Sequence, residues 1–166
     1  MAEDEGGAMA GRPGNGEDGA PQAGLLTQYV KDLSFENPNA PAVYQWQSQP
    51  RIDVQFNIAA QTIGNDLYEV SLKADVKAQS DEGPAFQVDL LYAGLFAIRN
   101  VSEGQLQPFL FAEAPRLLFP FARRVIADAI RDGGFPPLLV DPIDFGALYL
   151  AKTEAADQNS GIIGHA

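Results

Sequence analysis

Four segments of the chain alternate apolar and polar residues, which is the two-residue period of a half-buried β-strand. Residues 25–36 are expected to place Leu25, Tyr29, Leu33 and Phe35 on one face and Gln28, Asp32, Ser34 and Glu36 on the other. Residues 51–58 and 68–78 alternate in the same way over their whole length. Residues 85–98 begin with alternation and become apolar on both faces, as expected of a strand covered on two sides.

Short breaking segments separate these strands. The sequences NPNAP (37–41), IGND (63–66) and SDEGP (80–84) are rich in the residues that favour turns. Neighbouring strands joined by such connections pair antiparallel, and the sequence therefore predicts a four-stranded antiparallel meander.

After the strands the apolar period changes to that of a helix. Leu118, Phe121, Val125 and Ala129 follow helical spacing within residues 116–132. The pair Gly133-Gly134 ends this long helix, and Pro108, Pro115 and Pro120 indicate that the segment before it is broken. Asp141 or Asp144 caps a second, shorter helix that runs to about residue 153. Strands followed by helices place the chain in the α+β class.

Composition divides the 166 residues into one folded domain and two tails. Residues 1–24 are rich in Gly, Ala and acids and are expected to be a disordered leader, because they bury too little apolar surface to offset their ordering entropy. Residues 25–153 form the domain, and residues 154–166 are expected to be a flexible tail. The first residues have neither the basic nor the apolar region of a signal peptide, and no apolar run is long enough for a membrane span.

The net charge of −11 disfavours nucleic acid and anionic membranes as partners and favours a basic protein. The same acidity also serves solubility alone. The chain has no cysteine, so disulfides and thiolate metal sites are excluded, and a reducing cytoplasm is allowed. We expect no metal and no cofactor. The one histidine, His165, lies next to the chain end. Asp141 and Asp144 could form a paired-carboxylate site, but helix capping explains both, so the chain is not expected to be an enzyme.

Two apolar, proline-bounded loops favour a binding function. The first holds Val43, Tyr44 and Trp46, and aromatic side chains of this kind offer large contact area at low entropic cost. The second is residues 135–149. The alternative is that both loops only pack on their own core. Together the loops could frame a groove for an extended or unfolded peptide.

The segments YVKDLSFENPNAP (29–41) and LFPFARRVIADAIRDGGFPPLLVDPIDFGALY (118–149), with the strands between them, resemble the SecB family of bacterial protein-export chaperones. The resemblance implies a four-stranded sheet with two helices, assembled as a homotetramer that is a dimer of dimers. It also implies a cytoplasmic protein that binds unfolded preproteins without ATP, keeps them translocation-competent and passes them to the motor ATPase SecA.

The resemblance also implies site residues. The SecA contacts fall on Asp32, Glu36 and Glu82. The client groove falls on the first-loop residues and on five further apolar positions, which gives Val43, Tyr44, Trp46, Ile52, Val54, Phe56, Leu148 and Tyr149. The chain departs from the family at Ser48, where the loop tryptophan is expected, and at Ser80, where a leucine is expected. A dedicated chaperone of a toxin–antitoxin pair shares the same fold, but such versions tend to replace the acids that contact SecA.

Overall fold

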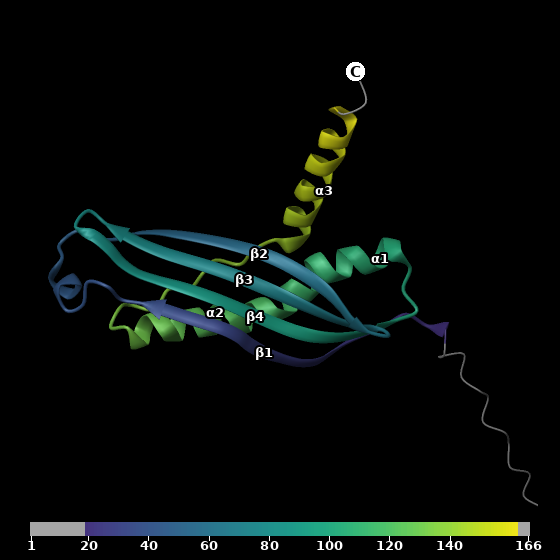
Figure 1. Ribbon diagram of the computed structural model, residues 1–166, viewed down its shortest axis with the longest axis horizontal. Helices are drawn as coiled ribbons and strands as arrows, with labels where there is room; N and C mark the ends of the chain where they lie inside the picture. The colour runs from purple at the N-terminus through teal and green to yellow at the C-terminus, as the bar shows by residue number, and fades with distance from the viewer. Residues whose placement is uncertain (1–18, 163–166) are drawn as a thin grey trace, which may run out of the picture.

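The computed structural model describes residues 19–162, and over this range an antiparallel sheet of four long strands carries helices on one face (Figure 1). The strands are β1 (Gln22–Glu36), β2 (Arg51–Gly64), β3 (Leu67–Ser80) and β4 (Gly83–Arg99). The predicted α+β class is confirmed, and the turns at 63–66 and 80–84 are where the sequence places them. Strand β1 begins inside the expected leader. Residues 1–18 of the expected leader and His165 lie outside the described residues.

The strand order is β1-β4-β3-β2, which corrects the expected four-stranded meander. Only β2, β3 and β4 follow one another across the sheet. The connection from β1 to β2, residues 37–50, contains the short 3₁₀ helix η2 (Ala42–Gln45) and crosses the end of the sheet, so that β1 pairs with β4. This is a Greek-key order, and it leaves β1 and β2 as the two edges.

Two irregularities in β1 change which side chains share a face. The pairing with β4 shifts between Leu25 and Thr27 and again between Val30 and Asp32. Each extra residue reverses the alternation that follows it. Tyr29 therefore pairs with Ala93 on the outer face, and Gln28 pairs with Gly94 on the helix-covered face, which is the reverse of the expectation for both. Two shifts restore the original phase, so the expected faces hold for the end of the strand.

The core lies between the inner face of β3 and β4 and the long helix α2 (Ala114–Asp132). The buried positions on the two strands alternate as the sequence predicts, and include Val70, Leu72, Val76, Val88, Leu90 and Phe96. Gly94 lets the helix approach closely, because a Cβ there would lie 2.8 Å from Cδ2 of Leu118. Helix α2 lies over β3 and β4, and the inner face of edge strand β2 is only half buried.

The segment before α2 is helical, which corrects the predicted break. Helix α1 (Glu103–Pro108) and the π-helical segment η3 (Phe109–Glu113) lead directly into α2, and Pro120 lies inside α2. A π-helical turn is one way for a helix to continue past residues that interrupt its hydrogen-bond ladder. Gly134, with φ of 86°, ends the run as expected, because this conformation favours glycine.

The last helix, α3 (Phe145–Ile162), is longer than predicted and nearly matches α2 in length. The expected end near residue 153 is therefore wrong by about two turns. Asp144 caps its start, since its Oδ1 accepts a hydrogen bond of 3.0 Å from the backbone N–H of Ala147. Figure 1 shows α3 projecting away from the sheet and from α2. Phe145 and Leu148 in its first turns pack against the core.

Candidate functional site

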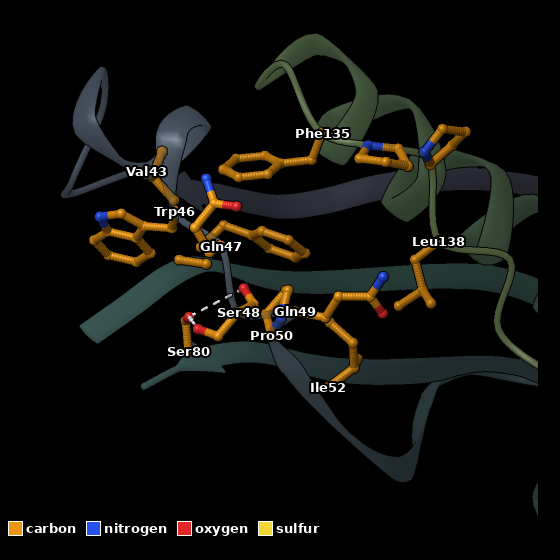
Figure 2. Close-up of a pocket in the computed structure, with 14 residues that line it drawn as sticks. Val43, Trp46, Gln47, Ser48, Gln49, Pro50, Ile52, Ser80, Phe135 and Leu138 are labelled. Carbon is orange, nitrogen blue, oxygen red and sulfur yellow. Dashed lines mark hydrogen bonds between the residues drawn. The ribbon is translucent and has the colours of Figure 1, made fainter. Parts of the chain in front are cut away.

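An open, largely apolar pocket lies at the end of the sheet where β2 begins. Two loops frame it: residues 46–50 on one side and residues 135–138 on the other. Its volume of about 590 Å³ lies in the range of small-molecule and peptide side-chain sites. Figure 2 shows the ring of Phe135 facing the loop that carries Trp46, with Ile52 and Leu138 along the opposite part of the pocket.

Three of the residues expected in a client groove line this pocket: Val43, Trp46 and Ile52. Val43 is buried, whereas Ile52 is 40% exposed and therefore accessible to a ligand. Tyr44 lies beside the pocket and has a structural contact. Its hydroxyl donates a 2.8 Å hydrogen bond to the carbonyl of Gly133, which ties the first loop to the end of α2.

The other expected groove residues lie further along the molecule. Val54 and Phe56 share the inner face of β2 with Ile52, but both pack partly against the core, and the Phe56 ring meets Phe119 edge to face. Leu148 and Tyr149 do not line the pocket. They lie on the first turns of α3, where Tyr149 stacks on Phe111 with ring centroids 6.2 Å apart. The structure therefore does not bring the eight residues into one cavity.

The pocket also contains residues beyond the eight expected groove positions, and four of them belong to the second loop that was predicted to frame the groove. The proline-stiffened stretch Phe135–Leu138 and the strand residue Phe86 supply much of its apolar wall. The signal for the first was present in the sequence, because two prolines after Gly133-Gly134 mark an apolar segment that cannot continue the helix. Phe86 gave no separate signal, since it fits the alternation of a core strand.

Both family departures meet at the rim of the pocket. The hydroxyls of Ser48 and Ser80 lie 2.6 Å apart, and they lie 2.5 and 2.7 Å from Oε2 of Glu82. Ser80 is buried, whereas Glu82 is exposed in the turn. The hydrogen bonds from Ser48 and then from Ser80 lower the pKa of Glu82 below its usual value. Figure 2 shows these hydroxyls beside the pocket.

The outer face of the sheet, opposite the helices, is polar and acidic at the same end. Residues directly paired across strands point to the same face. The pairing therefore lines up Glu36 with Gln87 and Lys77, and it lines up Asp32 with Leu91 and Lys73. Both acids are exposed. Asp32, Ser34 and Glu36 thus share the outer face of the sheet, as the alternation predicts.

Between these two rows lies a carboxyl pair, since Asp75 is directly opposite Asp89. The hydrogen bond with Asp89 raises the pKa of Asp75, with burial and the Asp89 charge adding to the effect.

A second cluster lies further along the outer face. Glu69 accepts hydrogen bonds from Lys31 at 2.7 Å and from the Tyr29 hydroxyl at 2.5 Å. These bonds lower the pKa of Glu69, with Lys31 the larger cause. The carboxylate in turn raises the pKa of Tyr29 to about 12.

Within residues 19–162 no group of three or more histidine or acidic side chains is arranged to hold a metal ion. Asp144 acts as a helix cap. Searched over the same residues, the chain has no helix that is long and apolar enough to cross a membrane.

Comparison with known proteins identifies close relatives. The family model of the preprotein translocase subunit SecB matches residues 16–156. The protein-export protein SecB of Sphingopyxis alaskensis is 65% identical over 142 residues, which cover 86% of this chain and 83% of that protein. The protein of the same name from Zymomonas mobilis is 63% identical over 143 residues, covering 86% and 87% of the two chains.

A solved structure has a similar fold. It is a SecB-like chaperone from Mycobacterium tuberculosis in complex with a peptide from an antitoxin. The TM-score is 0.61 at 17% sequence identity, and the match covers 73% of this chain and 90% of that one. At this identity the likeness concerns the fold alone.

Proposed function

The chain belongs to the SecB family of protein-export chaperones, and from that premise we propose that it binds unfolded preproteins without ATP and delivers them to the motor ATPase SecA. The observation that carries this proposal is the open apolar pocket between residues 46–52 and 135–138, which is a suitable receptor for the apolar side chains of an unfolded chain. Each client leucine or phenylalanine buried there contributes about 1.5–3 kcal/mol. Several such pockets on one assembly add avidity to weak local contacts.

The proposed assembly is a homotetramer, built as a dimer of dimers. Large apolar side chains remain uncovered on two surfaces of the single chain. On edge strand β1, Leu26, Val30 and Leu33 are 43–57% exposed, and on α2 Leu117 and Phe121 are about 40% exposed one helical turn apart. Apolar surface of this kind in a small domain favours association with further copies.

The proposed docking surface for SecA consists of Asp32, Glu36 and Glu82. All three are exposed, and the first two lie on the outer face, away from the core. The charges of Asp32 and Glu36 contribute little to folding, which leaves them available for a basic partner. The chain retains these acids, which supports a role in protein export and not that of a dedicated chaperone for a toxin–antitoxin pair. The protein is proposed to act in the cytoplasm, where preproteins are made.

The test compares two isoleucines of the same strand. Ile52 lines the pocket, whereas Ile63 lies at the far end of β2 and is similarly exposed, at 52% against 40%. An unfolded preprotein is diluted from denaturant with the chain present and ATP absent, and its aggregation is followed by light scattering. I52S should weaken suppression of aggregation several-fold, and I63S should behave as the wild type. Equal behaviour of the two variants would remove the pocket from the proposal.

A further inference from the structure

The rim of the pocket contains a hydrogen-bonded triangle that links two segments that no strand pairing joins. Ser48 comes from the loop of residues 46–50, Ser80 ends β3, and Glu82 lies in the following turn. The pairing of β2 with β3 starts at Arg51 and Gln79, so the loop before Arg51 lies outside the ladder. The backbone of Ser48 also hydrogen-bonds the Glu82 carboxylate, and Asn39 donates a 2.8 Å hydrogen bond to the carbonyl of Pro84 beside the turn. The ion pair between Arg51 and Asp81 lies here too, but its side chains are 71% and 73% exposed and so contribute little.

Counting the available protons shows that the Glu82 carboxylate is the main acceptor among the three groups. The three groups make three short contacts, at 2.5, 2.6 and 2.7 Å, but the two serines supply only two protons. An ionised carboxylate only accepts, and hydrogen bonds to it are stronger than bonds between neutral groups. At least one hydroxyl therefore donates to Glu82 at any moment, and the 2.6 Å contact is a hydrogen bond in which either serine can be the donor.

A second arrangement is available to the buried hydroxyl. Ser80 also lies 3.4 Å from the backbone carbonyl of Ser48, and this contact is too long to be strong. If Glu82 becomes a weaker acceptor, the Ser80 hydroxyl can turn to the carbonyl of Ser48. A buried hydroxyl without a partner is costly, and this bond avoids that cost. This bond still joins Ser80 to the loop, but at 3.4 Å it is weaker than the bonds to the carboxylate. The loop that carries Trp46 is then held less firmly against the end of β3.

We propose that Ser48 and Ser80 are positioning residues that couple the pocket to the charge of Glu82. This inference rests on the proposed function, because it takes from there that clients enter the pocket and that a basic partner docks on Glu82. A lysine or arginine of the partner draws on the same carboxylate that holds the loop. Docking therefore loosens the wall formed by residues 46–50 and lowers the affinity for the client, which is the direction required for transfer.

The test uses Trp46, the one tryptophan of the chain, as a reporter of the loop. A double-mutant cycle compares E82Q, S48A/S80A and the triple variant, with S71A as a matched control on the same strand β3. Two quantities are measured for each protein: quenching of Trp46 fluorescence by acrylamide, and affinity for a labelled unfolded preprotein segment that lacks tryptophan. Tetralysine at low salt serves as the basic probe for the wild type.

E82Q and S48A/S80A should each increase quenching and weaken client affinity about fivefold, the low end of typical couplings between sites. The triple variant should show no further change, S48T should retain wild-type behaviour, and S71A should be neutral. Tetralysine should increase Trp46 quenching in the wild type and leave S48A/S80A unchanged. Additive effects, or a wild-type response in S48A/S80A, would overturn the coupling. If the wild type binds no client, the proposed function is refuted instead. The quenching of Trp46 across the double-mutant cycle then still shows whether Ser48, Ser80 and Glu82 hold the loop together.

Discussion

Charge reversal at Asp32 and Glu36 is the sharpest perturbation of the proposed docking surface. The two residues are four positions apart on β1, and at 3.3–3.4 Å per residue they stand about 13 Å apart along the strand. That separation exceeds the Debye length of about 10 Å at 0.1 M salt, so the two charges act nearly independently. Each exposed ion pair with a basic partner contributes about 0.2–1 kcal/mol. Reversal replaces attraction with a repulsion of similar size.

The double variant D32K/E36K should therefore lose about 1–4 kcal/mol of binding free energy to SecA, which is roughly a 5- to 1000-fold loss of affinity. Both side chains are exposed, so the free energy of unfolding should change by less than about 1 kcal/mol. Client affinity should be unchanged, because the pocket is lined from the opposite face of the sheet. Isothermal titration calorimetry at two salt concentrations measures the effect, and wild-type binding should also weaken as salt rises.

The matched control is D141K/E154K, which changes the net charge by the same amount at two exposed positions away from the sheet. If the control lost as much affinity as D32K/E36K, the effect would be one of net charge and the assignment of a docking surface would fail. Wild-type affinity in D32K/E36K would place the SecA contact on another surface.

Three further changes test particular contacts. The hydrogen bond to Glu69 raises the pKa of Tyr29 to about 12, so the stabilisation from this bond is complete below pH 10 and disappears between pH 10 and 12. In urea unfolding, Y29F should lack this pH-dependent loss of stability. A pH profile of Y29F equal to that of the wild type would argue against the bond. D144A should cost about 1 kcal/mol through loss of the cap of α3 and lower the helical circular dichroism, with client binding intact. L117D/F121D should dissociate the proposed tetramer into smaller assemblies that stay folded, and light scattering that shows a tetramer for this variant would rule out this face as the interface.

The sequence pattern predicted the strands well where one face of each strand is covered. The alternation in β2 and β3 matches the structure because every second side chain is buried in β3 and partly buried in most of β2. In β1 the two irregularities exchanged the faces of Gln28 and Tyr29, and no residue in the local sequence predicts these irregularities. The alternation also could not predict the strand order, because the connection of residues 37–50 is long enough to place β2 either beside β1 or at the opposite edge of the sheet.

The candidate site was only partly predictable for a related reason. Its two loops are far apart in sequence, and the segments just before them are joined by a tertiary contact, the hydrogen bond from the Tyr44 hydroxyl to the carbonyl of Gly133. Apolar composition identified both loops. It did not distinguish Leu138, which lines the pocket, from Leu148 and Tyr149, which lie on α3. In the sequence Ser48 and Ser80 are two separate departures from the family pattern, and in the structure their hydroxyls contact each other.

The most direct measurement of the central claim is complex formation among the chain, purified SecA and an unfolded preprotein in the absence of ATP. Size-exclusion chromatography with light scattering gives the mass of each species. We expect a free protein of four times the 17.8 kDa of one chain, a complex with the unfolded preprotein, and a larger complex when SecA is added. A monomer that leaves the preprotein to aggregate, with no species containing SecA, would contradict the account.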